Sequence, residues 1–159
     1  MKGWHDAGDL TVYNATMTQS LFWMLEAWSD FRPMDDNMNI PESGNGVPDL
    51  LDEARWGLEW LLSMQDPNGG FWCNATAHNG TNSYPYGTTF PQSVSPYMKT
   101  VPPTVQATAK AIAVLGYAAG IFRSYDQAFA NRCLAAARSG WTWMIANPNA
   151  TYDGCGGCS

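Results

Sequence analysis

The stretch IPESGNGVPDLLDEARWGLEW, residues 40–60, contains the clearest helix signal in the sequence. A loop whose glycines permit positive φ leads into Pro48, and the fixed φ of proline suits the first position of a helix. The first turn then carries three carboxylates: Asp49, Asp52 and Glu53. Negative charge is favoured at the N-terminal end of a helix, so we expect a structural role for all three. Leucines recur at steps of three and four while Trp56 and Trp60 lie on the opposite side, which predicts a helix packed on two faces.

Three more helices are predicted around this one, over about residues 10–31, 104–125 and 127–146. Asp126 has the residue type of an N-cap for the last helix. Between the second and third helices lies a stretch, 68–103, rich in Gly, Asn, Ser, Thr, Tyr and Pro, and loops of this length usually carry function or cover something. No alternating strand pattern competes, so the predicted fold class is all-α, with two helix pairs joined by one long loop.

The composition excludes several functional classes. The 159 residues correspond to one ordinary domain, and a formal charge of -6 does not suit a nucleic-acid backbone or an anionic membrane. Charged residues make up 14% of the chain and hydrophobic residues 45%, a balance that excludes disorder. No run approaches the roughly 18 consecutive apolar residues of a membrane span, and the N-terminus lacks the apolar region of a secretory signal. We therefore expect neither nucleic acid nor membrane as a partner.

The segment Trp4-His5-Asp6-Ala7-Gly8-Asp9 places two carboxylates three residues apart around a glycine, just before the first predicted helix. Two close carboxylates separate their pKa values and hold a water jointly, one accepting its proton while the other orients it. Such a pair is the base apparatus of a hydrolase. The alternative is that Asp6 or Asp9 caps the helix, and spacing alone favours the cap because capping aspartates are common.

This segment and residues 40–60 together closely resemble the start of the catalytic module of glycoside hydrolase family 9, the inverting cellulases. The match continues more loosely through Gly69-Gly70, Ser95-Pro96 and residues 125–137, so it spans essentially the whole chain. The resemblance implies an (α/α)6 barrel, an extracellular location, and hydrolysis of β-1,4-glucan by a water that attacks opposite the leaving group. It also implies that Asp9 takes the proton of this water and that Asp6 helps to bind the water.

The chain departs from the family pattern in its length. An inverting glycosidase needs a second carboxyl group roughly 6.5–9.5 Å from the base, and in the family this acid is a glutamate near the end of a much longer module. About four of the twelve expected helices are present, so residues 1–159 are expected to be an N-terminal portion of the catalytic domain. The second and third helices are apolar around most of their circumference. We therefore expect self-association, or association with the rest of the module.

Two other interpretations stay open at this point. One is a non-catalytic, all-α fragment that binds glucan or serves assembly, and the other is a parent enzyme acting on a different β-linked oligosaccharide. Because aromatic faces stack on the C–H faces of sugar rings, Trp4 and Trp72, together with His5, are assigned to substrate binding. Packing against the helices explains most of the other aromatic residues of the long loop.

The cysteines offer a weaker hypothesis. Cys155-Gly-Gly-Cys158, with Cys73 and His78, has the ligand types of a zinc site, and some members of the family bind metals. The separation of the two halves favours surface thiols or a disulfide instead, so neither a metal nor a cofactor is expected. Cys133 lies on an apolar helix stripe and is expected in the core.

Overall fold

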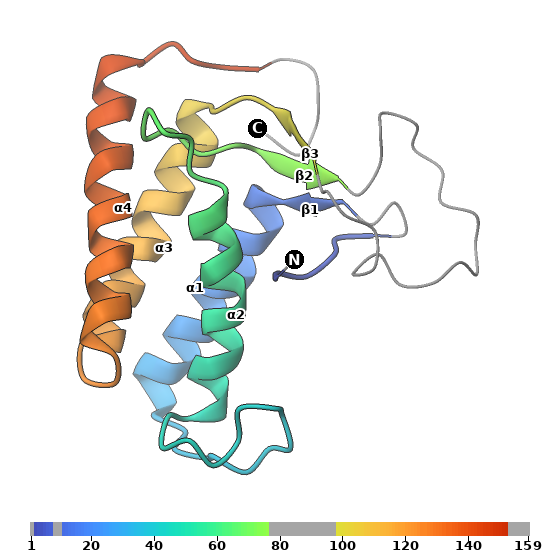
Figure 1. The fold of residues 1–159 in the computed structure, drawn as a ribbon, viewed down its shortest axis with the longest axis vertical. Helices are drawn as coiled ribbons and strands as arrows, with labels where there is room; N and C mark the ends of the chain where they lie inside the picture. The colour runs from blue at the N-terminus through green and yellow to red at the C-terminus, as the bar shows by residue number, and fades with distance from the viewer. Residues whose placement is uncertain (1, 8–10, 77–97, 153–159) are drawn as a thin grey trace.

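The computed structural model describes residues 2–7, 11–76 and 98–152, and within these ranges helices dominate the fold (Figure 1). The helices are α1 (Asn14–Phe31), α2 (Asp49–Ser63), α3 (Val105–Phe122) and α4 (Gln127–Ala146). Each agrees with its predicted bounds to within about one turn. The predicted N-cap of α4 is also confirmed, since the Asp126 carboxylate accepts a hydrogen bond from the Phe129 N–H at 2.9 Å.

The helices enclose one hydrophobic core. Helix α1 packs against both α2 and α3, and α3 packs against α4. The α2 and α4 sides are joined by ion pairs: Arg132 meets Glu59 through two bonds of 3.0 and 2.9 Å, and Arg55 meets Asp126 at 2.9 Å. The core draws fully buried side chains from all four helices, among them Leu21, Leu25, Leu58, Leu61, Leu115 and Phe129. Cys133 is buried there as predicted, and burial raises the pKa of its thiol to about 12.

Helix α3 is the most apolar of the described elements. Its 18 residues have a mean hydropathy of 1.4, so among the described residues it alone has the length and composition of a membrane span. Half of this helix is buried inside the fold, between α1 and α4. Its small buried side chains are alanines, among them Ala111, Ala118 and Ala119, and they pack in the core against the neighbouring helices.

A small antiparallel sheet was missed by the sequence pattern. Its strands are β1 (Val12–Tyr13), β2 (Asn74–Thr76) and β3 (Met98–Val101), in the order β1-β2-β3. The expectation that no strand interrupts the helices was therefore wrong. Strands of two to four residues are too short to show the alternation over four to eight residues that identifies a strand. The sheet joins the start of α1 to two segments from within the stretch 68–103 that was predicted to be a loop.

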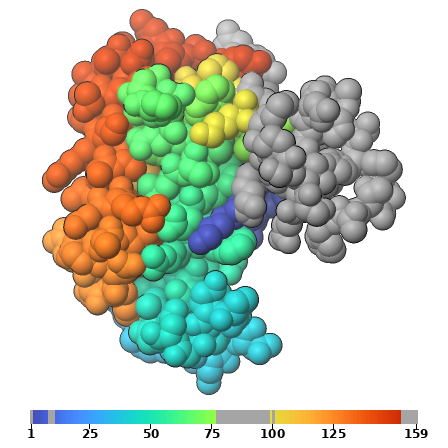
Figure 2. All heavy atoms as spheres, viewed as in Figure 1, coloured from blue at the N-terminus to red at the C-terminus, as the bar shows by residue number. Residues whose placement is uncertain are grey.

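The exposed apolar side chains lie on other helices than expected. Helix α2 was predicted to have an uncovered apolar face, but its leucines and Trp60 are largely buried, and the N-terminal segment lies across its side (Figures 1 and 2). The most exposed large apolar side chains within the described ranges come from α1, α4 and the loop after α1: Trp23, Phe31, Met34, Met38, Trp141 and Ile145. Helical spacing from Phe129 and Cys133 predicts Trp141 and Ile145 on the buried stripe of α4. This prediction was wrong, because both are exposed and Trp143 is buried.

Candidate functional site

The N-terminal segment is held in contact with α2 and α1. Gly3 has φ +90°, and a side chain there would come within 2.8 Å of the Trp60 ring and 2.9 Å of the Met17 methyl carbon. The Gly3 carbonyl accepts a hydrogen bond from the Trp56 indole N–H at 3.3 Å. Only glycine fits this position, because the conformation is left-handed and there is no space for a Cβ.

Trp4 is fixed next to it by one hydrogen bond and one close contact. Its indole N–H donates to Glu53 Oε1 at 2.7 Å, and the far edge of its ring lies over Gly57, one turn further along α2. A Cβ on Gly57 would stand 2.6 Å from the Trp4 ring and 3.0 Å from Leu21 of α1. The indole therefore occupies a notch that exists because residue 57 has no side chain.

Trp4 and His5 separate two clefts. The larger, of about 520 Å³, is lined by Gly3, Trp4, His5, Pro41, Glu42, Glu53 and Trp56. The smaller, of about 310 Å³, is lined by Trp4, His5, Asp6, Thr16, Met17 and Ser20. Aromatic rings beside carboxylates and hydroxyls are the combination that binds sugars, with stacking on the C–H faces and hydrogen bonds to the hydroxyl groups. The predicted residues Trp4, His5 and Asp6 are thus brought together along one surface.

Asp6 does not occupy the N-cap position of the following helix. Helix α1 starts at Asn14, its N-cap residue is Tyr13, and the Tyr13 side chain makes no capping hydrogen bond. The alternative role as a helix cap was therefore wrong for Asp6. Asp6 is exposed, and its N–H donates to the Thr11 carbonyl at 3.0 Å. Gly8 and Asp9 lie outside the described residues.

The loop before α2 brings Pro41 and Glu42 to the larger cleft. The Asp36 carboxylate accepts hydrogen bonds from the Gly44 and Gly46 N–H groups at 2.6 and 2.8 Å, and these two amides lower the pKa of Asp36. Both glycines have positive φ, as the sequence predicts. The two hydrogen bonds to Asp36 hold this part of the loop in place.

Two carboxylates in the first turn of α2 also form hydrogen bonds with this loop. The Asp49 carboxylate accepts from the Met38 N–H at 2.5 Å and from the Ser43 hydroxyl at 2.8 Å. Asp52 accepts from the Asn45 side chain at 2.9 Å, and burial is the main cause that raises the pKa of Asp52. The predicted structural role of these two carboxylates is confirmed.

Trp72 is not brought to the clefts that Trp4 and His5 line. Its indole N–H donates to Asp66 at 3.0 Å. Cys73 is buried, and its sulfur lies 3.4 Å from the Thr104 hydroxyl. The other members of the hypothetical zinc set, His78, Cys155 and Cys158, lie outside the described residues. Across the described ranges, no three Cys, His, Asp or Glu side chains gather as metal ligands.

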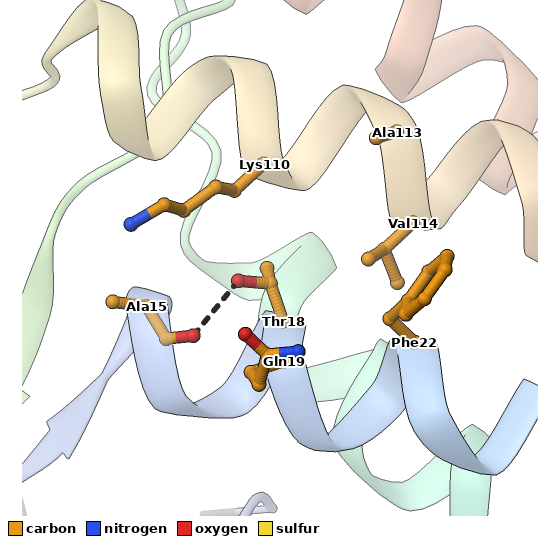
Figure 3. A pocket seen from close by; sticks show the side chains of 7 residues that line it. All are labelled: Ala15, Thr18, Gln19, Phe22, Lys110, Ala113 and Val114. Atoms are coloured by element: carbon orange, nitrogen blue, oxygen red, sulfur yellow. Dashed lines mark hydrogen bonds between the residues drawn. The ribbon is translucent and has the colours of Figure 1, made fainter.

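A separate groove of about 200 Å³ lies between α1 and α3 (Figure 3). Val114, Ala113 and Lys110 line it from α3, and Phe22, Gln19, Thr18 and Ala15 line it from α1. The Thr18 hydroxyl donates to backbone carbonyls of its own helix, 2.7 Å to Asn14 and 3.1 Å to Ala15. This groove shares no lining residue with the two clefts beside Asp6.

Sequence reasoning missed Glu53, Trp56 and Pro41 as residues of the site. One sign that another group packs against α2 was present: Gly57 lies in the interior of a strong helical pattern, where glycine costs about 1 kcal/mol relative to alanine. The pattern does not reveal that the approaching group is Trp4, 53 residues earlier in the chain.

Known proteins resemble this chain over nearly its whole length. The family described as glycosyl hydrolase family 9 matches residues 1–157. Endoglucanase D of Acetivibrio thermocellus is 34% identical over 149 residues, which are 92% of this chain and 23% of that protein. A xyloglucan-specific endo-beta-1,4-glucanase of Bacteroides ovatus, BoGH9A, is 33% identical over 157 residues, 96% of this chain and 26% of that protein. The chain thus spans about a quarter of the length of these relatives.

Solved structures agree with these matches. A metagenome-derived family 9 endoglucanase superposes with a TM-score of 0.83 at 38% identity, over 98% of this chain and 28% of that chain. The structure of AaCel9A with cellobiose-like isofagomine gives a TM-score of 0.80 at 30% identity, over 98% of this chain and 30% of that one. The four helices accordingly correspond to a portion of an (α/α)6 barrel, as the resemblance implies.

Proposed function

Since this chain belongs to glycosyl hydrolase family 9, we propose that it supplies the catalytic base of an enzyme that hydrolyses β-1,4-glucosidic bonds in cellulose or related β-glucans. The observation that carries the proposal is the position of Trp4 and His5 on both clefts, with Asp6 beside them on the smaller one. On the smaller cleft, the Trp4 ring and the His5 imidazole lie beside Asp6, the carboxylate that the family motif assigns to binding the water. Tyr13 is the N-cap residue of α1, so helix capping does not compete as an explanation for Asp6.

The proposed reaction is an inverting hydrolysis. Asp6 binds a water, Asp9 accepts its proton, and the water oxygen attacks the anomeric carbon from the face opposite the leaving group. The bond to the leaving oxygen breaks as a carboxylic acid protonates that oxygen. By the family motif this acid lies beyond the present chain, and Glu42 is the first carboxyl group on the larger cleft to test in its place.

Substrate binding is proposed for Trp4 and His5 along the clefts, and for Trp72 only because an aromatic face can stack on a sugar ring. The named activities of the relatives, which include endoglucanase and xyloglucan-specific endo-beta-1,4-glucanase, support a β-glucan as the substrate. An extracellular location is proposed on the same ground.

The test is hydrolysis of a soluble β-1,4-glucan by the protein at its natural length. We expect Asp9→Asn to lower the rate by about 10²–10⁴, the usual contribution of a general base, and Asp6→Asn to lower it strongly. Proton NMR of the first product should show the α-anomer, which is the mark of inversion. Thermal midpoints of both variants separate catalysis from folding.

Three results would contradict the proposal. Equal activity in Asp9→Asn and wild type would remove the base assignment. A β-anomer as first product would exclude inversion. Binding of glucan without turnover by the natural-length protein would favour the non-catalytic glucan-binding role instead.

A further inference from the structure

Glu53 lies on the larger cleft and is bonded to the residue two positions before Asp6. We propose that Glu53 is a positioning residue of the hydrolytic site: it holds the Trp4 indole against Gly57 and so fixes the chain segment that carries the base apparatus. This inference rests on the proposed function, and it adds a residue that acts through Trp4 rather than on the sugar.

The first step of the argument is geometric. The bond from the Trp4 N–H to Glu53 Oε1 is 2.7 Å long, and both residues are partly buried. Hydrogen bonds to an ionised acceptor are shorter and stronger than those between neutral groups. One turn along α2, the notch at Gly57 accepts the far edge of the same ring. The indole is therefore fixed at its N–H and at its opposite edge.

The second step concerns the backbone on either side. Gly3 is fixed before Trp4, because Trp60 and Met17 leave no space for a side chain and the Trp56 N–H binds the Gly3 carbonyl at 3.3 Å. After Trp4, the Asp6 N–H is bonded to the Thr11 carbonyl at 3.0 Å. Asp6 thus lies in a short segment that is held at Gly3, at the Trp4 indole and at its own N–H. Glu53 provides the bond to the indole.

The third step is energetic. A misplacement of about 1 Å in a reacting group costs about a hundredfold in rate, even when the mutated residue is remote from the chemistry. Removing the Glu53 acceptor leaves the indole N–H without its partner and frees the ring to leave the notch. The carboxylate of Asp6 then loses its fixed position relative to the water.

The experiment compares Glu53→Ala with Glu53→Gln, whose amide oxygen still accepts the indole N–H. The first readout is the ¹⁵N–¹H indole resonance of Trp4, assigned with Trp4→Phe. The second is kcat and KM on a soluble β-1,4-glucan across pH, with the protein at its natural length. Glu59→Ala is the matched control, because Glu59 lies on the same helix and binds Arg132.

We expect Glu53→Ala to shift the Trp4 resonance and to lower kcat about tenfold to a hundredfold, with KM changed by less than about threefold. Glu53→Gln should restore most of kcat and keep the wild-type pH profile. Glu59→Ala should lower the thermal midpoint and leave both the resonance and kcat unchanged.

Three results would overturn the inference in whole or in part. A Trp4 resonance that does not move in Glu53→Ala would show that Glu53 does not hold the ring. Loss of kcat in Glu53→Gln as deep as in Glu53→Ala would show that the carboxyl group itself reacts. A wild-type protein without turnover would overturn the proposed function and the catalytic half of this inference, while the Trp4 resonance would still decide whether Glu53 holds the ring.

Discussion

Gly57 shows how one missing side chain shapes this site. In most helices alanine is preferred to glycine by about 1 kcal/mol, so a glycine in the middle of α2 has a local cost. Here a Cβ would meet the Trp4 ring at 2.6 Å, and the ring is held in place by Glu53. Packing of the Trp4 indole therefore favours glycine at position 57, whereas helix propensity favours alanine.

We predict that Gly57→Ala lowers the free energy of unfolding by about 1–3 kcal/mol, the usual cost of inserting a methyl group into a packed site. The measurement is urea unfolding with tryptophan fluorescence. Gly116→Ala in α3 is the control, because nothing lies within 4 Å of the Cβ it would add. That control should be neutral or stabilising by up to about 1 kcal/mol. A Gly57→Ala protein as stable as Gly116→Ala would mean that Trp4 moves aside freely.

At the scale of elements, α4 is positioned by the residue before it. The Asp126 carboxylate accepts the Phe129 N–H and also pairs with Arg55 of α2, so one side chain begins one helix and ties it to another. The backbone bond from Phe129 is the main cause that lowers the pKa of Asp126, and the Arg132 side chain does the same to Glu59.

Because the folded pKa of both carboxyl groups is below the unfolded one, their contribution to stability is present at neutral pH. It is lost as the pH falls below about 4 and through the folded values. We predict that Asp126→Ala lowers the free energy of unfolding by about 1 kcal/mol at pH 7. The difference from wild type should shrink as the pH falls toward 3, which thermal unfolding at several pH values would measure. A difference that stays constant would show that the charge of Asp126 contributes nothing.

Large apolar side chains are exposed on the surfaces of α1 and α4. Trp23 and Ile145 are each 63% exposed and Trp141 is 54% exposed. A few hundred Å² of such surface is worth several kcal/mol of association at roughly 25 cal/mol per Å². In the longer relatives, further chain is available to cover these helices.

We predict that the 159-residue chain alone self-associates, and that Trp23→Lys with Trp141→Lys weakens this association. Light scattering across a dilution series is the measurement. Glu26→Lys, which changes charge on α1 without removing apolar surface, controls for simple repulsion. A monomer at all concentrations, with a sharp cooperative melting transition, would show that the four helices need no partner.

The four helices, the N-cap at Asp126 and the motif at Asp6 and Asp9 could be predicted from the amino-acid sequence, because each depends on neighbours within a few residues. Periodicity, capping chemistry and loop glycines are local properties, and a long motif can be identified in the sequence alone. The tertiary structure alone decided the rest. It set the bond between Trp4 and Glu53, which are 49 residues apart, and the pairing of strands of two to four residues. It also decided that Trp141 is exposed and Trp143 is buried. Those features depend on which surfaces meet, and that is fixed only when distant segments compete for the same contacts.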